Sequence, residues 1–156
     1  MNKTVIISES QIIGSHKNVH EPYEYYKQEI TNREHFNQLY AAFYEIPPQK
    51  SNYPFHYHEK NTELFYIIAG KGLIRTGEGV AVVEAGDVII CPPGENGGHK
   101  LTNISDSEVL RYLDVDTTNT PDILHYPDSN KIGIIKHNES STFYKDGKET
   151  DYYDGE

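Results

Sequence analysis

Between residues 36 and 116 the chain alternates between short apolar segments and tight turns. The segments are rich in Val, Ile, Leu, Tyr or Phe, and they cover residues 36–46, 55–58, 63–69, 72–76, 80–84, 87–91, 99–104 and 108–115. Sequences with Gly or Pro separate most of them, and no long stretch shows a 3.6-residue period. Many short strands at close spacing are typical of a β-sandwich or β-barrel. We therefore predict an all-β fold whose barrel spans residues 36–116.

Two polar flanks enclose this region. Residues 1–35 include a tyrosine-rich stretch at 23–26, and disordered segments are usually poor in aromatic residues. The aromatic content favours an ordered N-terminal arm that lies over the barrel or over a partner subunit, and a disordered tail is the alternative. Residues 117–156 form a C-terminal extension, in which 132–136 can add one strand. The acidic end, residues 150–156, is expected to fray.

Charge and cysteine content restrict the partners and the compartment. The 156-residue chain suits one domain and carries a formal net charge of -10, with no stripe of Lys and Arg such as nucleic acids and anionic membranes attract. Its single cysteine, Cys91, cannot form an internal disulfide, and the N-terminal apolar run at residues 5–7 is too short for a secretory signal. We therefore expect a cytoplasmic protein that binds neither nucleic acid nor a membrane.

Three histidines and one glutamate carry the chemistry. His56 and His58 are two residues apart, so both imidazoles point to the same face of a strand. Glu63 opens the next apolar segment, and His99 lies far along the chain, where a closed barrel brings distant strands together. Three neutral imidazoles and one carboxylate leave a divalent ion with a net positive charge and with open positions for water or substrate. The alternative is that these are ordinary polar residues on an exposed sheet.

The spacing of these residues resembles the two motifs of the cupin family. The first motif is similar to His56-x-His58-x4-Glu63-x6-Gly70, and the second is similar to Gly86-x5-Pro92-x-Gly94-x4-His99-x3-Asn103. The chain departs from the family at Lys50, where a glycine is usual, and in the four residues between Gly94 and His99, where two are common. The loop at residues 95–98 is therefore expected to be longer or differently bent.

The resemblance implies a jelly-roll barrel, a double-stranded β-helix, like that of small bacterial single-domain cupins. It implies one divalent metal ion, Zn, Mn, Fe or Ni, held by His56, His58, Glu63 and His99. Cupins commonly pair through an N-terminal strand or a sheet face, so the resemblance also implies a homodimer, and C2 dimers are the commonest closed oligomers. Sugar or sugar-phosphate isomerases and iron dioxygenases are among the activities that it implies.

Candidates for substrate binding lie on the predicted strands. Arg75 and Arg111 fall inside strands, where a guanidinium that points into the barrel can hold a carboxylate or a phosphate. The alternative is that each faces solvent or a surface acid. By alternation Phe65 and Ile67 follow Glu63 toward the interior, where Phe65 either lines the site or simply packs in the core. Tyrosines near the first motif can donate hydrogen bonds, but the sequence does not select one of them.

We therefore expect a metal-dependent enzyme that acts on a small oxygenated molecule. An isomerase needs a base near the substrate carbon, whereas a dioxygenase needs iron with two open positions. The alternative function is a non-catalytic module that binds a small molecule and reports its presence to a partner. The four ligands suit each of these functions, so the sequence leaves open the metal, the catalytic residues and the question of catalysis itself.

Overall fold

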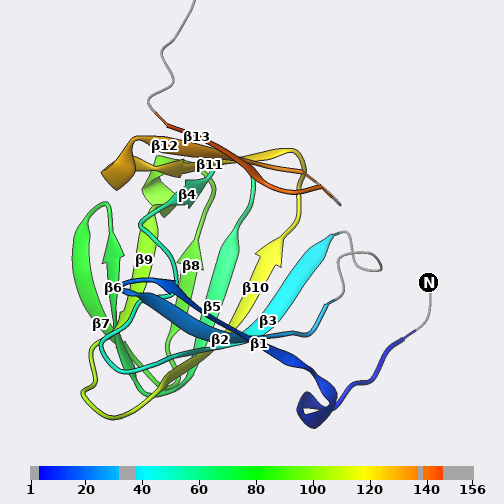
Figure 1. Cartoon of the computed structure of the whole chain (residues 1–156), viewed down its shortest axis with the longest axis vertical. Coiled ribbons are helices and arrows are strands. Elements are labelled where there is room, and N and C mark those ends of the chain that lie inside the picture. Colours follow the sequence, from blue (N-terminus) through cyan, green and yellow to red (C-terminus); the bar gives the residue numbers. More distant parts are fainter. Residues whose placement is uncertain (1–3, 32–37, 137–138, 146–156) are drawn as a thin grey trace, which may run out of the picture.

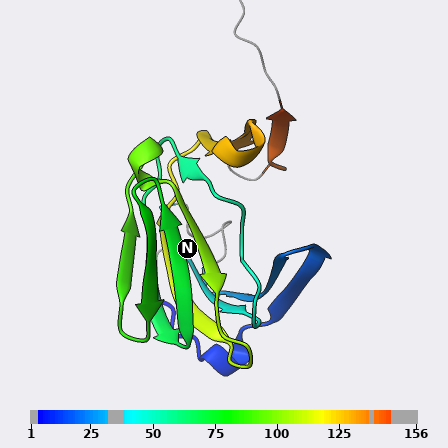
Figure 2. The same ribbon diagram turned by 90° about the vertical axis from the view of Figure 1, so that its left-hand side faces the viewer.

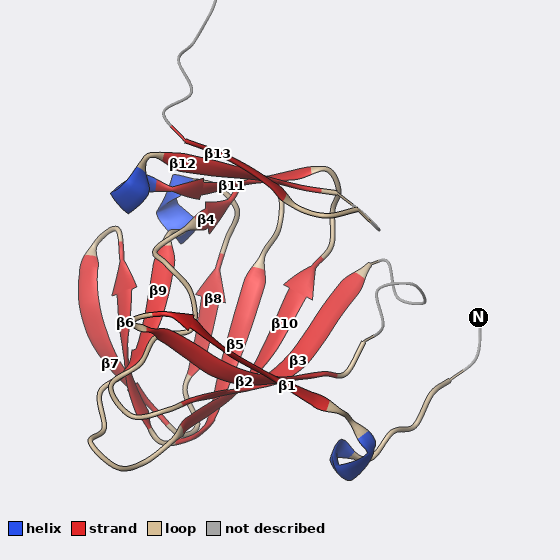
Figure 3. Ribbon diagram, in the orientation of Figure 1, coloured by secondary structure: helices blue, strands red, loops and turns tan. Residues whose placement is uncertain are grey.

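A computed structural model describes residues 4–31, 38–136 and 139–145. In these ranges the regular structure is β-strand, with three short 3₁₀ turns and no α-helix (Figure 3). The prediction of an all-β fold is therefore confirmed. The strands are β1 Gly14–His20, β2 Tyr23–Glu29, β3 Leu39–Ile46, β4 Tyr57–His58, β5 Glu63–Ala69, β6 Lys71–Thr76, β7 Gly79–Glu84, β8 Val88–Cys91, β9 His99–Asn103, β10 Leu110–Thr117, β11 Asp122–Tyr126, β12 Lys131–Ile135 and β13 Thr142–Lys145. The 3₁₀ turns are η1 Glu9–Gln11, η2 Glu95–Gly97 and η3 Pro127–Ser129.

Two sheets enclose the core as a jelly roll (Figure 1). The larger sheet has the strand order β1-β2-β3-β10-β5-β8, and the smaller has the order β7-β6-β9. The central strand β10 pairs in antiparallel fashion with both β3 and β5, which places Tyr112 between Tyr44 and Ile67. A third sheet, β13-β12-β11-β4, lies across one end of the molecule, at the top of Figure 1.

Strand alternation explains which side chains form the core. On β5 the predicted inward residues Glu63, Phe65 and Ile67 are buried, whereas Tyr66 between them is exposed, so the predicted alternation is confirmed. Burial of one large apolar side chain contributes about 1.5–3 kcal/mol. The core cluster comprises Tyr25, Tyr40, Ala42, Tyr44, Ile46, Phe65, Ile67, Ile74, Val83, Leu101, Leu110 and Tyr112. Five of these twelve are aromatic, which places phenol groups next to the polar site described below.

The N-terminal flank is built into the larger sheet. Strands β1 and β2 form a hairpin, and β2 pairs with β3, so that the hairpin extends the sheet by two strands (Figure 2). The strand predicted at residues 36–46 begins at Leu39 in the described part of the chain. Residues 32–37, and with them the predicted boundary between arm and barrel, lie outside the described residues.

The C-terminal flank contributes three strands where the sequence predicts one. The predicted strand at residues 132–136 corresponds to β12, which is accompanied by β11 and β13. Strand β13 is exposed along its whole length, and a strand without a buried face shows no apolar alternation in its sequence. The acidic end at 150–156 lies outside the described residues.

One glycine of the first motif is required by its surroundings. Gly70 joins β5 to β6 with φ 84°, a left-handed conformation that glycine adopts without a steric penalty. A Cβ atom at this position would lie 2.4 Å from the carbonyl oxygen of Val109. Only glycine at this position therefore allows the turn after β5 to lie so close to the start of β10. Within the described ranges, no helix has the length and apolar character needed to cross a membrane.

Candidate metal centre

The four predicted ligands converge from three parts of the barrel. His58 lies on β4, Glu63 begins β5 and His99 begins β9. His56 faces His99 in an antiparallel bridge, in which the backbone N–H of each residue donates to the carbonyl of the other, at 3.1 and 2.9 Å. This bridge brings a residue of the second motif beside the first motif. The ligand atoms of His56, His58 and Glu63 all lie within 4.8 Å of one another.

The distances within this cluster suit a single ion. His99 Nε2 lies 3.0 Å from Glu63 Oε2, His58 Nε2 lies 3.5 Å from Glu63 Oε1, and His56 Nε2 lies 3.8 Å from Glu63 Oε2. Nitrogen and oxygen ligands lie about 2.0–2.2 Å from zinc, so two ligands of one ion are about 3–3.5 Å apart. Each imidazole therefore lies at or near this separation from Glu63, and in the described part of the chain the cluster whose ligand atoms all lie within 4.8 Å of one another comprises His56, His58 and Glu63.

Backbone carbonyls fix the orientation of two imidazoles. His56 Nδ1 lies 2.9 Å from the carbonyl oxygen of Pro54, and His99 Nδ1 lies 2.9 Å from that of Gly97. A carbonyl oxygen can only accept, so each Nδ1 carries the proton and donates. The other ring nitrogen, Nε2, is then left with a free lone pair. Such outer partners are typical of metal-binding histidines, because they fix the tautomer and the direction of the ligand.

Asp122 on β11 fixes the ring of His58 in the same way, by accepting from its Nδ1. His58 Nδ1 donates to Asp122 Oδ2 at 2.5 Å, and Asn61 Nδ2 donates to the same oxygen at 2.7 Å. The other oxygen, Oδ1, accepts from the backbone N–H groups of Lys60 and Ile123 at 2.9 and 3.0 Å. The carboxylate is completely buried. No sequence pattern predicts this role of Asp122, because nothing local distinguishes it from a surface acid.

In their neutral forms the three imidazoles turn Nε2 lone pairs toward Glu63, so that all four converging groups are then hydrogen-bond acceptors. Oε2 of Glu63 is buried and accepts no hydrogen bond, although His99 Nε2 lies 3.0 Å away. A buried carboxylate among three lone pairs is unfavourable unless a proton or a cation lies between them. Imidazole and carboxylate together suit Zn, Fe, Ni or Mn. The arrangement of these residues therefore fits a divalent metal ion.

The pKa values show how strongly this cluster attracts positive charge. Burial lowers the pKa of His56 to about 4, so this imidazole is neutral at pH 7. Burial also lowers the pKa of His58, but the carboxylates of Asp122 and Glu63 outweigh burial and raise it to about 9. Burial raises the pKa of Glu63, but the neighbouring imidazoles, His99 first, hold it well below its usual range. In metal-free protein, protons on the imidazoles therefore balance Glu63, and a metal ion displaces them on binding.

The loop before His99 is fixed by close packing. It contains the short turn η2, and a Cβ atom on Gly97 would lie 1.7 Å from the carbonyl oxygen of Pro92. Gly97 also supplies the carbonyl that accepts from His99 Nδ1. The extra length of this loop, expected from the sequence, is taken up by η2, and the backbone of His99 still reaches His56.

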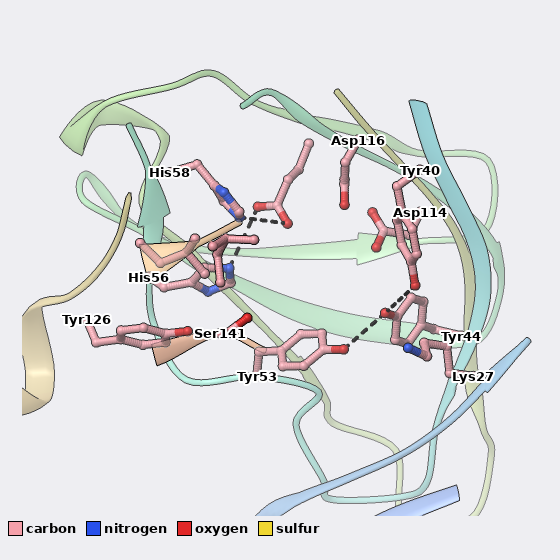
Figure 4. Close-up of a pocket in the computed structure, with 13 residues that line it drawn as sticks. Lys27, Tyr40, Tyr44, Tyr53, His56, His58, Asp114, Asp116, Tyr126 and Ser141 are labelled. Atoms are coloured by element: carbon pink, nitrogen blue, oxygen red, sulfur yellow. Dashed lines mark hydrogen bonds and ion pairs between the residues drawn. The ribbon is translucent and has the colours of Figure 1, made fainter. Parts of the chain in front are cut away.

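A polar cavity opens beside three of the four candidate ligands, His56, His58 and Glu63 (Figure 4). Its volume is about 200 Å³, which suits a small molecule of a few carbon atoms. Its lining comprises Lys27, Tyr40, Tyr44, Tyr53, His56, His58, Glu63, Asp114, Asp116, Leu124, Tyr126, Ile135 and Ser141. Hairpin β1–β2 supplies Lys27, and the C-terminal extension supplies Leu124, Tyr126, Ile135 and Ser141. Both flanks of the predicted barrel therefore help to form the cavity.

Phenol groups line one wall of the cavity. Tyr44 lies at the centre of a chain of hydroxyls, with Tyr40 Oη at 3.2 Å and Tyr53 Oη at 3.0 Å (Figure 4). Tyr126 lies near the metal ligands, and its ring stacks on that of His56 with the centroids 5.7 Å apart. Burial, with the charge of Glu63, raises the pKa of Tyr126 to about 12, so its hydroxyl remains a hydrogen-bond donor at neutral pH.

Two acids of the cavity were not among the predicted site residues. Asp114 and Asp116 lie on β10 two residues apart, and Figure 4 shows both carboxyl groups directed into the cavity. Leu110 and Tyr112 on the same strand are completely buried. The available signal was alternation, because a strand that buries Tyr112 also turns Asp114 inward. The sequence did not reveal which face of this strand is buried.

The structure does not bring the three predicted substrate-binding residues into the cavity. Arg75 lies over the ring of Phe55 and pairs with Asp128 at the surface. Arg111 lies on the outer face of the larger sheet, because Leu110 and Tyr112 occupy the inner face, and it contacts Glu9 and Glu45.

Phe65 does face the interior, but it packs beneath the site. Its ring centroid lies 5.3 Å from that of His99 and 5.2 Å from that of Tyr112, and its side chain is buried. It therefore supports the His99 imidazole from the core and is not among the residues that line the cavity.

Comparison with known proteins agrees with the fold and the site. Residues 42–116 match the family model of the cupin domain. With the jelly-roll architecture, this match identifies residues 42–116 as a cupin domain. No match was found among curated proteins.

Solved structures of low identity share this fold. A candidate sugar phosphate isomerase from Acidithiobacillus ferrooxidans has a TM-score of 0.80 and 18% identity, over 94% of this chain and 96% of that one. A sugar phosphate isomerase of the cupin superfamily from Silicibacter pomeroyi has a TM-score of 0.78 and 18% identity, over 91% and 93%. A predicted oxalate decarboxylase from Thermotoga maritima has a TM-score of 0.64 and 24% identity, over 74% of this chain and 100% of that one. The first two matches include both flanks of the barrel.

Proposed function

We propose that this cupin is a metal-dependent enzyme that acts on a small polyhydroxylated molecule, such as a sugar or a sugar phosphate. The observation that carries this proposal is the convergence of His56, His58 and His99 on Glu63, with His56, His58 and Glu63 in the wall of a polar cavity. A closed structural site would bury its ligands away from any cavity, whereas a reactive site keeps open positions. Two structural neighbours that are named for sugar phosphate isomerisation support the substrate class by analogy.

The candidate ligands and the cavity have different roles in this proposal. When bound, the metal supplies a Lewis acid that polarises a carbonyl or hydroxyl oxygen of the substrate. Asp122 holds the His58 ring, and the carbonyls of Pro54 and Gly97 hold the rings of His56 and His99, so the ligand set is oriented before substrate enters. The buried setting excludes bulk water and strengthens each polar interaction inside it.

The phenol wall is suited to hydroxyl-rich ligands. Tyr40, Tyr44 and Tyr53 offer hydroxyl groups that both donate and accept. Lys27 adds a cation to the same cavity, and its ammonium is held 2.6 Å from Glu29. A sugar presents several hydroxyl groups, and a sugar phosphate or sugar acid adds an anionic end that can lie near Lys27.

The test is to load the full chain with one equivalent of Zn, Mn, Ni or Fe and to screen sugars and sugar phosphates. Binding is measured by calorimetry and isomer formation by NMR, and His58→Ala serves as the variant with an impaired site. The proposal predicts a ligand that binds only to metal-loaded wild type and is converted to an isomer. Binding without any conversion would favour the non-catalytic module, and oxygen uptake by the iron form would favour a dioxygenase.

We also propose that the chain forms a homodimer through the outer face of the larger sheet. On this face Tyr66 lies opposite Val88, and Leu64 lies opposite Ile90. The exposed fractions of Tyr66, Val88 and Ile90 are 44%, 56% and 63%, and an exposed apolar patch of this kind is typical of an interface. Light scattering should give twice the chain mass of 17.8 kDa for wild type and a single chain mass for Ile90→Lys. A wild-type monomer would refute the dimer.

A further inference from the structure

Asp114 and Asp116 are two cavity acids that metal binding does not explain. Asp114 is only 4% exposed, and Oδ1 of each carboxyl group is buried without a hydrogen-bond partner. None of the ion pairs found in the described part of the chain involves either residue. Buried acids without a cation are unfavourable for folding, so their presence in a cavity indicates a function.

Their placement puts them beside both the substrate space and the ligand set. Asp116 lies directly opposite Glu63 in the β10–β5 ladder, and Asp114 lies opposite Phe65. Directly opposed residues in an antiparallel ladder have Cβ atoms about 4.5–5.5 Å apart, on the same face of the sheet. The Asp116 carboxyl group is therefore one strand away from a metal ligand. Both carboxyl groups line the cavity that His56, His58 and Glu63 also line, so a molecule bound in it would lie beside them.

We propose that Asp114 and Asp116 are an acid–base pair that moves a proton between adjacent carbon atoms of the substrate, so that the reaction is the isomerisation of a small α-hydroxy aldehyde or ketone. This inference rests on the proposed function, and it selects proton transfer over O2 chemistry. Two neighbouring carboxyl groups hold one proton more easily than they lose both, because like charges repel in a buried site. One group is then a base while the other is an acid.

The reaction that this pair can perform is balanced without a further reactant. The base takes the proton from the hydroxyl-bearing carbon, and the C–H electron pair forms a double bond to the carbonyl carbon. The carbonyl oxygen takes up a proton from the acid, so a hydroxyl group replaces the carbonyl group. Return of a proton to the former carbonyl carbon and loss of the original hydroxyl proton complete the isomerisation. No oxidant, reductant or second substrate is consumed.

Electrostatics agree with the placement. Burial raises the pKa of Asp114 well above its ordinary value, and the charge of Asp116 raises it further. General acids and bases work best when their pKa lies near the working pH. The inference itself stands on the burial, the free oxygens and the position of the two groups in the cavity.

The experiment follows hydrogen exchange from substrate carbon to solvent. Full-length protein loaded with Zn or Mn is incubated in D2O with three- to six-carbon aldoses and ketoses, each with and without a terminal phosphate. Deuterium uptake at the carbon next to the carbonyl is measured by mass spectrometry. We expect uptake with wild type and a decrease of about 100-fold or more in Asp114→Asn and Asp116→Asn, since general acid–base groups contribute about 10²–10⁴-fold. Asp128→Asn, a surface change, should leave uptake at the wild-type rate.

Two further readouts separate this inference from the proposed function. Metal content and calorimetric binding of the sugar should be unchanged in both Asn variants, and melting curves should confirm that they fold. Infrared spectra of metal-loaded wild type should show the C=O stretch of a buried carboxylic acid, and each Asn variant should lack it. Wild-type uptake in both Asn variants, or no acid band in wild type, would overturn the acid–base pair and leave the metal-dependent function standing. Wild type that fails to bind metal, or fails to bind sugar, would instead refute the proposed function.

Discussion

Replacement of Asp122 by Asn tests how the outer partners hold the metal centre. The change keeps the size of the side chain but replaces one acceptor oxygen with an NH2 group. In the wild type, Oδ2 accepts from both His58 Nδ1 and Asn61 Nδ2, at 2.5 and 2.7 Å. If the Asn oxygen stays with the N–H groups of Lys60 and Ile123, its NH2 group faces two donors.

His58 can relieve this clash by moving its proton from Nδ1 to Nε2, but Nε2 is then lost as a ligand. Loss of an outer partner typically costs 10–100-fold in metal affinity, or about 1.4–2.8 kcal/mol. If the proton stays on Nδ1, a buried donor is left without a partner, which costs about 1–3 kcal/mol of folding free energy. Either response weakens the metal-loaded protein by a similar amount.

The assay is competition for zinc against a chelating dye, with circular dichroism as the test of folding. Asp122→Asn should bind zinc about 10–100-fold more weakly than wild type. Asp128→Asn, which changes an exposed carboxylate paired with Arg75, should bind like wild type. A folded Asp122→Asn protein whose zinc affinity lies within twofold of wild type would refute the role of Asp122 in orienting His58.

Five further predictions concern the loop, the core, pH, which has two, and the surface. Gly97→Ala should lower both the melting temperature and the bound zinc, because its Cβ would meet the carbonyl of Pro92 at 1.7 Å; wild-type zinc content would contradict this. Ile67→Ala should cost about 2–5 kcal/mol of unfolding free energy in urea titrations, because the side chain is completely buried. Zinc affinity should rise from pH 6.5 to 9, because the metal must displace the proton from His58, whose pKa is about 9; competition titrations at several pH values would refute this if affinity is flat. In metal-free protein the same raised pKa means that the charged imidazole stabilises the fold most below pH 6.5, and that this stability is lost as pH rises through about 9. Arg75→Ala should change the unfolding free energy by less than about 1 kcal/mol, because its ion pair is exposed.

Local patterns predicted the strands and the pair His56 and His58, because the relevant spacing is short, whereas His99 was assigned from the resemblance of its motif to the cupin family. His56 and His58 share a face of one strand, and the burial of Glu63, Phe65 and Ile67 follows the predicted alternation. Asp122 could not be predicted, because it meets His58 through the pairing of β11 with β4, far apart in the sequence. Long-range pairing of this kind leaves no trace in the spacing of residues.

The sequence of β10 did not show which face of the strand is buried, and the reason is physical. Its outer face carries Leu113 and Val115, which are partly buried, so both faces of the strand are apolar in sequence. Alternation then cannot tell Arg111 from Asp114 as the inward residue. The β1–β2 hairpin was not predicted for the opposite reason, because β1 is exposed along its whole length and shows no apolar face. Hydrophobic periodicity is informative only where one face of a strand is buried.

The most direct test of the account is the metal content of reconstituted protein, measured by elemental mass spectrometry for wild type, His99→Ala and His125→Ala. His125 pairs with Glu59 outside the ligand set, so its variant controls for the loss of a histidine. The account predicts one equivalent of a divalent metal in wild type and in His125→Ala, and much less in His99→Ala. No metal in wild type after reconstitution, or equal metal in all three proteins, would contradict a centre built from His56, His58, Glu63 and His99.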